Sequence, residues 1–117
     1  RCAACGVRFL YEEITVVDAA HLVPFRETHD DSPQNGMALC KNHHWLMDSR
    51  LISPGPGPRK AYDRPRWHVR KGLDDRIEGQ RELLELKNRA VIVPGDGRLR
   101  PKPEALDRRM EMLAEAC

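Results

Sequence analysis

The feature that most limits how this 117-residue chain can fold is two pairs of potential metal ligands, each with its two members three residues apart. Cys2 and Cys5 form a Cys-x-x-Cys turn, and Cys40 and His43 repeat the three-residue step at the start of a predicted helix. Zinc favours closed sites of sulfur and nitrogen ligands when its role is structural. We therefore expect a structural zinc site, and its predicted ligands are Cys2, Cys5, Cys40 and His43.

Two alternatives to this site remain open. The cysteines could be small buried residues without a metal, and Cys117 is a rival to His43 as the fourth ligand. A terminal residue is usually frayed, which favours His43. Four cysteines in a sequence without a signal-like start fit metal ligation better than disulfide bonds.

A metal would help this chain because its hydrophobic core is thin. It has only two Phe, two Tyr and two Trp, and 32% of its residues are charged. These numbers suit a single domain over residues 1–117 that gains from a metal. No apolar run approaches the roughly 18 residues of a membrane span, so we expect a cytoplasmic protein with no membrane contact. The chain opens at Arg1 rather than Met, and we expect it to be a fragment of a longer protein.

The first half of the chain predicts strands followed by a helix. Residues 7–25 alternate loosely and are rich in β-branched and aromatic residues, which indicates strands ending near His21. Residues 26–36 have the composition of a loop, closed by a turn at Asn35-Gly36. A short helix is expected over about residues 41–49, with Trp45 and Leu46 packing inward.

The second half predicts shorter elements. The segment SPGPGP, residues 53–58, is expected to break regular structure. It would divide a core, residues 1–50, from a basic C-terminal extension, residues 51–117. In that extension we expect a short strand at 67–72, a helix over 74–88 weakened at Gly79, a strand at 90–93, and a last helix starting near Pro103.

A second group of polar residues surrounds the predicted helix. His44 and Asp48 are four residues apart, so they lie on one face of a helix. An imidazole and a carboxylate open to water can hold a divalent cation that also binds phosphate. Taken alone, such a pair is more often a surface hydrogen bond. His21 at a strand end and Asn35 before the helix extend the pattern.

The order His21, Asn35, His44, with steps of 14 and 9 residues, resembles the His-Asn-His (HNH) endonucleases of the ββα-metal fold. The segments AHLVPF, NGMALCKNHHWLMD and the later AVIVP and RPKPEAL are similar to a bacterial HNH branch often fused to DNA-reading modules. The motif is specific over residues 18–48 and only suggestive after residue 58. The resemblance implies an α+β fold, with a small ββα-metal core, a Cys₃His zinc site, and C-terminal short strands and helices.

The resemblance also implies a role for each residue of the motif. His21 would be the general base, Asn35 would fix the loop and orient His21, and His44 with Asp48 would hold one Mg²⁺ or Mn²⁺. Many HNH enzymes carry a metal-binding Asp or His directly before the base, where this chain has Ala20. Three alternatives remain open: Asp18 reaches round, a water molecule fills the place, or two protein ligands and the phosphate hold the metal.

The implied function is a metal-dependent DNA endonuclease domain that hydrolyses phosphodiester bonds, as the cleavage module of a restriction-type enzyme. Double-stranded DNA and a further DNA-recognition domain of the full-length protein would be its partners. The alternative is a non-catalytic zinc module that binds nucleic acid or protein. Such a module would not need the second group of polar residues, which are His21, Asn35, His44 and Asp48. The sequence does not decide the target site, DNA against RNA, or whether a homodimer is needed to cut both strands.

A basic stretch supports the DNA partner. The net charge is −2 over residues 1–50 and +4 over residues 51–117, counting Lys and Arg against Asp and Glu. Residues 59–71 hold six Lys or Arg against one Asp, interleaved with Tyr62, Trp67 and His68, and can neutralise phosphates. The alternative interpretation of residues 59–71 is a solvent-exposed face that binds no DNA, with Trp67 packed in the core. The predicted DNA contacts are Arg59, Lys60, Arg64, Arg66, Arg70 and Lys71.

Overall fold

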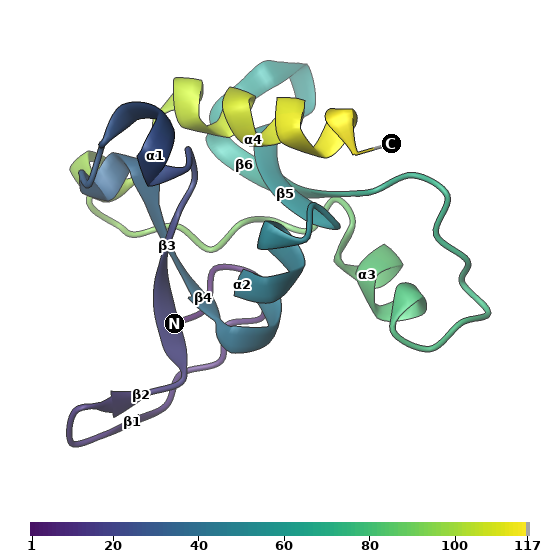
Figure 1. The fold of residues 1–117 in the computed structure, drawn as a ribbon, viewed down its shortest axis with the longest axis horizontal. Helices are drawn as coiled ribbons and strands as arrows, with labels where there is room; N and C mark the ends of the chain where they lie inside the picture. The colour runs from purple at the N-terminus through teal and green to yellow at the C-terminus, as the bar shows by residue number, and fades with distance from the viewer. Residues whose placement is uncertain (117) are drawn as a thin grey trace.

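The computed structural model describes residues 1–116 and has the predicted mixed α+β class (Figure 1). Within those residues the strands form three two-stranded antiparallel sheets, β1–β2, β3–β4 and β5–β6. The strands are β1 (Leu10–Tyr11), β2 (Ile14–Thr15), β3 (Val17–His21), β4 (Gly36–Cys40), β5 (Ile52–Gly57) and β6 (Ala61–Val69). The helices are α1 (Phe25–Thr28), α2 (Lys41–Asp48), α3 (Gln80–Leu86) and α4 (Pro103–Glu115), with 3₁₀ turns η1 (Pro33–Asn35), η2 (Pro58–Lys60) and η3 (Gly97–Leu99).

The ββα unit is formed by β3, β4 and α2. In the β3–β4 pair Ala19 lies opposite Ala38 and His21 lies opposite Gly36. Helix α2 starts directly after β4 and packs on both strands (Figure 1). Because side chains alternate across a strand, Asp18 and Ala20 share one face of β3 and His21 lies on the other.

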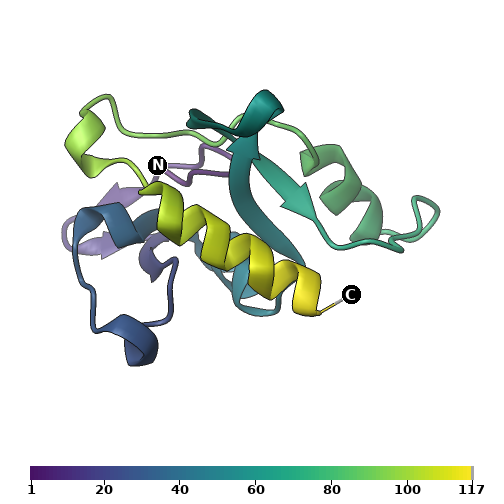
Figure 2. The same ribbon diagram turned by 90° about the horizontal axis from the view of Figure 1, so that it is seen from above.

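The C-terminal half packs into the same core as the ββα unit. Its buried members Ile52, Trp67 and Leu86 cluster with Leu39 and Met47 of the first half. Helix α4 lies across β5, as Figure 2 shows. The core is therefore continuous across residue 50, the point at which the sequence suggested a division.

The sequence predicted that the segment SPGPGP would break regular structure, and this prediction is wrong. The segment forms most of β5. Trp67, opposite Pro54, donates its backbone N–H to the carbonyl of Arg89 and accepts from the N–H of Asn88. Pro54 therefore occupies a position that needs no hydrogen bond to β6. Prolines are tolerated in strands at such positions.

Several predicted elements in the first half differ in detail. The stretch 26–36 is not a plain loop, because it contains part of α1 and all of η1. The pair Asn35-Gly36 is not a turn, since Gly36 begins β4. In α2, Trp45 is 64% exposed and does not pack inward, while Leu46 is partly buried and Met47 is fully buried.

The second half also departs from expectation. The strand expected at 67–72 is the end of the longer β6, and Gly79 precedes α3 instead of interrupting a longer helix. Of the strand expected at 90–93, only Ala90 forms a bridge, with Arg66. Helix α4 begins at Pro103 as predicted. Among residues 1–116, no helix combines the length and the apolar character that crossing a membrane requires.

The fold generates a prediction at Gly57, where the β5–β6 pairing is irregular. A Cβ at this position would collide with the backbone carbonyl oxygen of Arg64, which cannot rotate away. We expect Gly57→Ala to lower the free energy of unfolding by about 1–3 kcal/mol, measured by urea denaturation. The control is Gly95→Ala, because a Cβ at Gly95 meets nothing within 4 Å. Equal stability of the two variants would contradict the close approach.

Candidate functional site

The first pair of predicted zinc ligands lies in a tight turn. Residues 3–5 form the turn, closed by a hydrogen bond from the Gly6 N–H to the Cys2 carbonyl, with an N···O distance of 2.9 Å. The Ala4 N–H lies 3.4 Å from the Cys2 sulfur and donates to it. This arrangement directs the sulfur atoms of the turn toward the start of α2.

The four predicted ligands come together. The Sγ atoms of Cys2, Cys5 and Cys40 and a ring nitrogen of His43 all lie within 4.8 Å of one another. The Cys40 Sγ is 3.1 Å from His43 Nδ1, and the Cys5 Sγ is 4.0 Å from the Cys40 Sγ. Ligands about 2.3 Å from a tetrahedral zinc ion stand about 3.8 Å apart, so the group can hold zinc. Cys117, the rival ligand, lies outside the described residues.

The electrostatics of the cluster also suit a cation. Burial raises the pKa of Cys2, but hydrogen bonds from His43 and from backbone amides outweigh it and lower the pKa to about 5. Burial and the neighbouring Cys2 thiol raise the pKa of Cys5 to about 11. The Cys2 contact raises the pKa of His43 to about 8. Thiolates this close repel one another, and a zinc ion among them would remove that conflict.

The neighbouring His44 belongs to a different cluster. Its Nδ1 lies 3.0 Å from Oδ2 of Asp18, and its Nε2 lies 3.3 Å from Oδ2 of Asp48. The hydrogen bond from His44, followed by that from Lys41, holds the pKa of Asp18 below its usual range. Since adjacent helical residues point about 100° apart, His43 and His44 face different surroundings. His44 is therefore flanked by two carboxylates.

His21 stands at the end of β3 and remains 40% exposed at its side chain. Its Nε2 lies 2.6 Å from Oδ1 of Asp31, and its ring contacts that of Phe25 at a centroid distance of 5.6 Å. A carboxylate only accepts hydrogen bonds, so Nε2 carries the proton in this contact. The other ring nitrogen, Nδ1, is then the acceptor.

Asn35 is fully buried and holds the loop that follows His21. Its Oδ1 accepts from the Val23 N–H at 2.9 Å, and its Nδ2 donates to the Val23 carbonyl at 3.1 Å and to the Asp30 carbonyl at 2.9 Å. Its own carbonyl accepts from the Leu22 N–H at 2.9 Å. The backbone after His21 is thus fixed on both sides of the Leu22–Val23 peptide.

Some residues of the site were missed or only partly foreseen. Asp18 was one of several alternatives, although it shares its strand face with Ala20, which is the signal that points to it. Asp31 carries no sequence signal, because it lies in a loop without a recognisable motif. The sequence predicts Trp45 in the core, whereas the structure exposes it one residue from His44.

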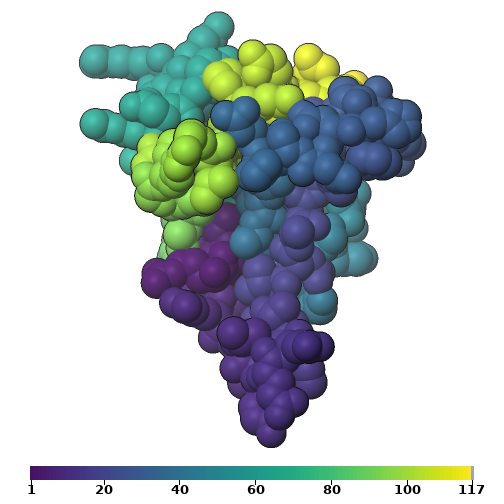
Figure 3. Space-filling model, turned by 90° about the vertical axis from the view of Figure 1, so that its left-hand side faces the viewer, coloured from purple at the N-terminus to yellow at the C-terminus, as the bar shows by residue number. Residues whose placement is uncertain are grey.

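The predicted basic strip is spread along the β5–β6 hairpin, whose tip side chains project from the body in Figure 3. Arg59, Lys60 and Arg64 are exposed, as is Lys71 after β6, while Arg66 and Arg70 are half-buried. Arg66 donates from Nη1 to the Asn88 carbonyl at 3.3 Å. The interleaved Trp67 is buried and belongs to the core, so its ring cannot lie against DNA.

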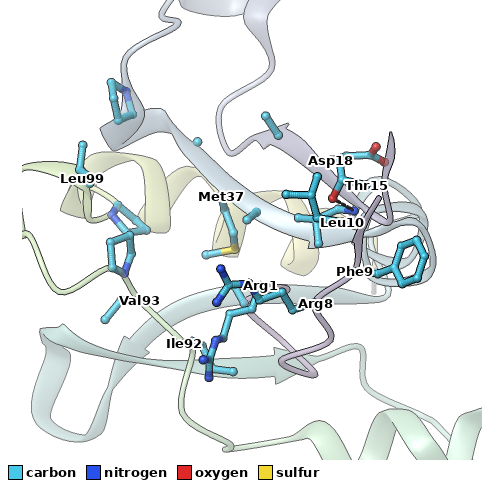
Figure 4. Close-up of a pocket in the computed structure, with 18 residues that line it drawn as sticks. Arg1, Arg8, Phe9, Leu10, Thr15, Asp18, Met37, Ile92, Val93 and Leu99 are labelled. Carbon is cyan, nitrogen blue, oxygen red and sulfur yellow. Dashed lines mark hydrogen bonds between the residues drawn. The ribbon is translucent and has the colours of Figure 1, made fainter. Parts of the chain in front are cut away.

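A groove of about 930 Å³ lies elsewhere, between the β1–β2 hairpin, the β3–β4 sheet and the segment 92–101 (Figure 4). Its lining is mostly apolar and includes Phe9, Met37 and Ile92. Asp18 lines the groove. His21, His44 and Asp48 do not. The side chains of His21, His44 and Asp48 are instead 40%, 29% and 60% exposed at the surface.

Since the adjacent histidines lie in separate clusters, their substitutions should fail differently. We expect His43→Ala to lose bound zinc and to unfold at a much lower Tm, because zinc binding is part of the folding free energy. The matched variant His44→Ala should keep both its zinc and its Tm. Zinc content by metal analysis and Tm by calorimetry measure the two outcomes, and identical behaviour of both variants would contradict separate clusters.

Comparison with known proteins agrees with the motif order. Residues 2–53 match the family model described as HNH endonuclease. No curated protein and no solved structure gives a significant match to the chain. The matched segment contains the four zinc-site residues together with His21, Asn35, His44 and Asp48, whereas β6, α3 and α4 lie beyond it. Residues 2–53 of this chain are thus similar to the HNH endonuclease family.

Proposed function

We propose that this chain is a metal-dependent DNA endonuclease domain that hydrolyses phosphodiester bonds. The observation that carries the proposal is the use of Asn35: it is buried and bonded to the backbone directly behind His21, in a segment that matches the HNH endonuclease family. Its three side-chain hydrogen bonds fix the backbone of Val23 and Asp30, in the loop that follows His21. A non-catalytic zinc module has no use for this arrangement.

His21 would act as the general base. Its Nε2–H donates to Asp31, which leaves the Nδ1 lone pair free to take a proton from the attacking water. Histidine is the side chain that most often serves as a general base in enzymes. Asp31 would orient the ring in the required tautomer.

His44 and Asp48 would hold a divalent ion. The Asp48 carboxylate suits Mg²⁺ or Mn²⁺, and with one imidazole, water and phosphate oxygens it would complete the coordination of such an ion. A metal-bound histidine usually donates its other ring N–H to a carboxylate, and Asp18 receives His44 Nδ1–H in this way. Asp18 would therefore orient His44 instead of replacing the ligand missing at Ala20. When bound, the ion would stabilise the charge that develops on the phosphate and the leaving oxygen.

Double-stranded DNA is the substrate that we propose, in a restriction setting. The exposed basic residues at and beside the β5–β6 tip would contact phosphates, which position a protein without reading sequence. Sequence or modification recognition would then fall to another domain of a longer protein. The exposed Trp45, beside His44, offers a further surface to a sugar or base.

The catalytic proposal predicts a loss of rate without a loss of fold. We expect His21→Ala to reduce plasmid cleavage in Mg²⁺ or Mn²⁺ by about 10²–10⁴-fold, the usual contribution of a general base, with Tm and DNA affinity unchanged. The control is His29→Asn, which tolerates the left-handed backbone at that position (φ 54°). A wild type that binds DNA but does not cut it in either metal would favour the non-catalytic module.

The DNA-contact proposal predicts salt-dependent binding. We expect the combined variant Arg59→Gln, Lys60→Gln, Arg64→Gln to bind duplex DNA more weakly whatever its sequence. Its slope of log affinity against log salt should fall by about 2.7, which is 0.9 for each of three lost phosphate contacts.

The matched control for this variant neutralises three other exposed arginines, Arg76, Arg81 and Arg98, of which Arg76 and Arg98 are paired with Asp74 and Asp96. Fluorescence anisotropy over a salt series measures both variants. An equal loss of affinity in both would show that net charge, and not the hairpin, governs binding.

A further inference from the structure

A buried arginine lies behind the candidate site without a carboxylate partner. Arg109 of α4 is 3% exposed, and within residues 1–116 its guanidinium reaches no carboxylate at ion-pair distance. It donates instead to two backbone carbonyls, from Nη2 to Met47 at 2.6 Å and from Nη1 to Leu22 at 3.4 Å. Its Nε is buried and has no partner.

The two carbonyls belong to backbone next to the two candidate clusters. Leu22 directly follows His21, the candidate base, and Met47 directly precedes Asp48, a candidate metal ligand. The two residues lie on separate elements, one after β3 and the other in the last turn of α2. A single planar guanidinium therefore ties together the backbone positions from which both functional side chains extend.

Packing alone does not account for an arginine at this position. A buried charge without a paired carboxylate is costly to desolvate, and apolar residues of similar volume often serve stability as well or better. The guanidinium can donate in a fixed fork to two acceptors at once, which no apolar side chain and no lysine can do. The benefit of Arg109 should therefore appear in geometry.

We infer that Arg109 is a positioning residue of the nuclease site, acting through the Leu22 and Met47 carbonyls to fix the distance between His21 and Asp48. The inference rests on the proposed function and adds a residue that lies beyond the matched segment 2–53. Asn35 holds the Leu22–Val23 backbone from one direction, and Arg109 holds it from another while linking it to α2.

The test compares Arg109→Met and Arg109→Lys with Arg108→Met. Arg108 is the neighbouring arginine on α4 and pairs at the surface with Glu27, at 3.0 Å, without touching the site backbone. We expect Arg109→Met to keep its zinc and its KM for DNA, while kcat falls about 10²-fold, the effect of a small misplacement of reacting groups. The Mn²⁺ concentration for half-maximal cleavage should rise. Arg109→Lys should be intermediate, and Arg108→Met should match the wild type.

A second readout does not depend on activity. The imidazole ¹⁵N resonances of His21 and His44 report their surroundings directly, and both should shift in Arg109→Met but not in Arg108→Met. Unchanged resonances in folded Arg109→Met, or equal shifts in the control, would overturn the inference. If Arg109→Met does not fold, Arg109→Lys serves in the same comparison. If the wild type proves inactive, the proposed function fails, while the resonances still decide whether Arg109 positions these residues.

Discussion

The Cys₃His cluster is the arrangement on which the rest of the structure depends, because the turn that carries it is also a backbone junction. Ala3, between the two turn cysteines, donates its N–H to the Ala38 carbonyl of β4. Its own carbonyl accepts from the Trp67 indole at 3.2 Å and from the Ile92 N–H at 2.9 Å. A metal held by this turn would therefore order β4, β6 and the segment near residue 92 together. In a chain with six aromatic residues, that contribution to folding matters.

The same cluster sets the orientation of the second site. With His43 directed at the sulfur atoms, the rotation of α2 about its axis is fixed, and His44 must turn toward the Asp18 face of β3. The proposed structural and catalytic metals thus have ligands, His43 and His44, that are adjacent in sequence but lie on different faces of one helix. This explains how two neighbouring histidines can take part in unrelated chemistry.

Local patterns predicted the features that depend on local spacing. The strand end at His21, the start of α2, the start of α4 at Pro103 and the four gathered zinc-site residues all follow from short-range rules. The failures depend on tertiary partners. The strand character of SPGPGP requires knowing that Trp67 bonds away from Pro54, and the exposure of Trp45 requires knowing which face of α2 is covered. Asp31 and Arg109 entered the site only through the fold, because neither has a motif of its own.

The matched segment and the structural unit are therefore not the same. Residues 2–53 contain every group proposed to act on the scissile phosphate or to hold a metal, yet Trp67, Val91 and Arg109 from beyond that segment pack against it or bond to its backbone. The side chains of Leu22, Leu39 and Met47 are fully buried, and parts of them would be exposed to water without the second half of the chain. Because a small core has little stability to spare, the proposed function divides the work: the local ββα motif would supply the chemistry, and the C-terminal half would supply the rigidity that holds His21 and Asp48 at a fixed distance.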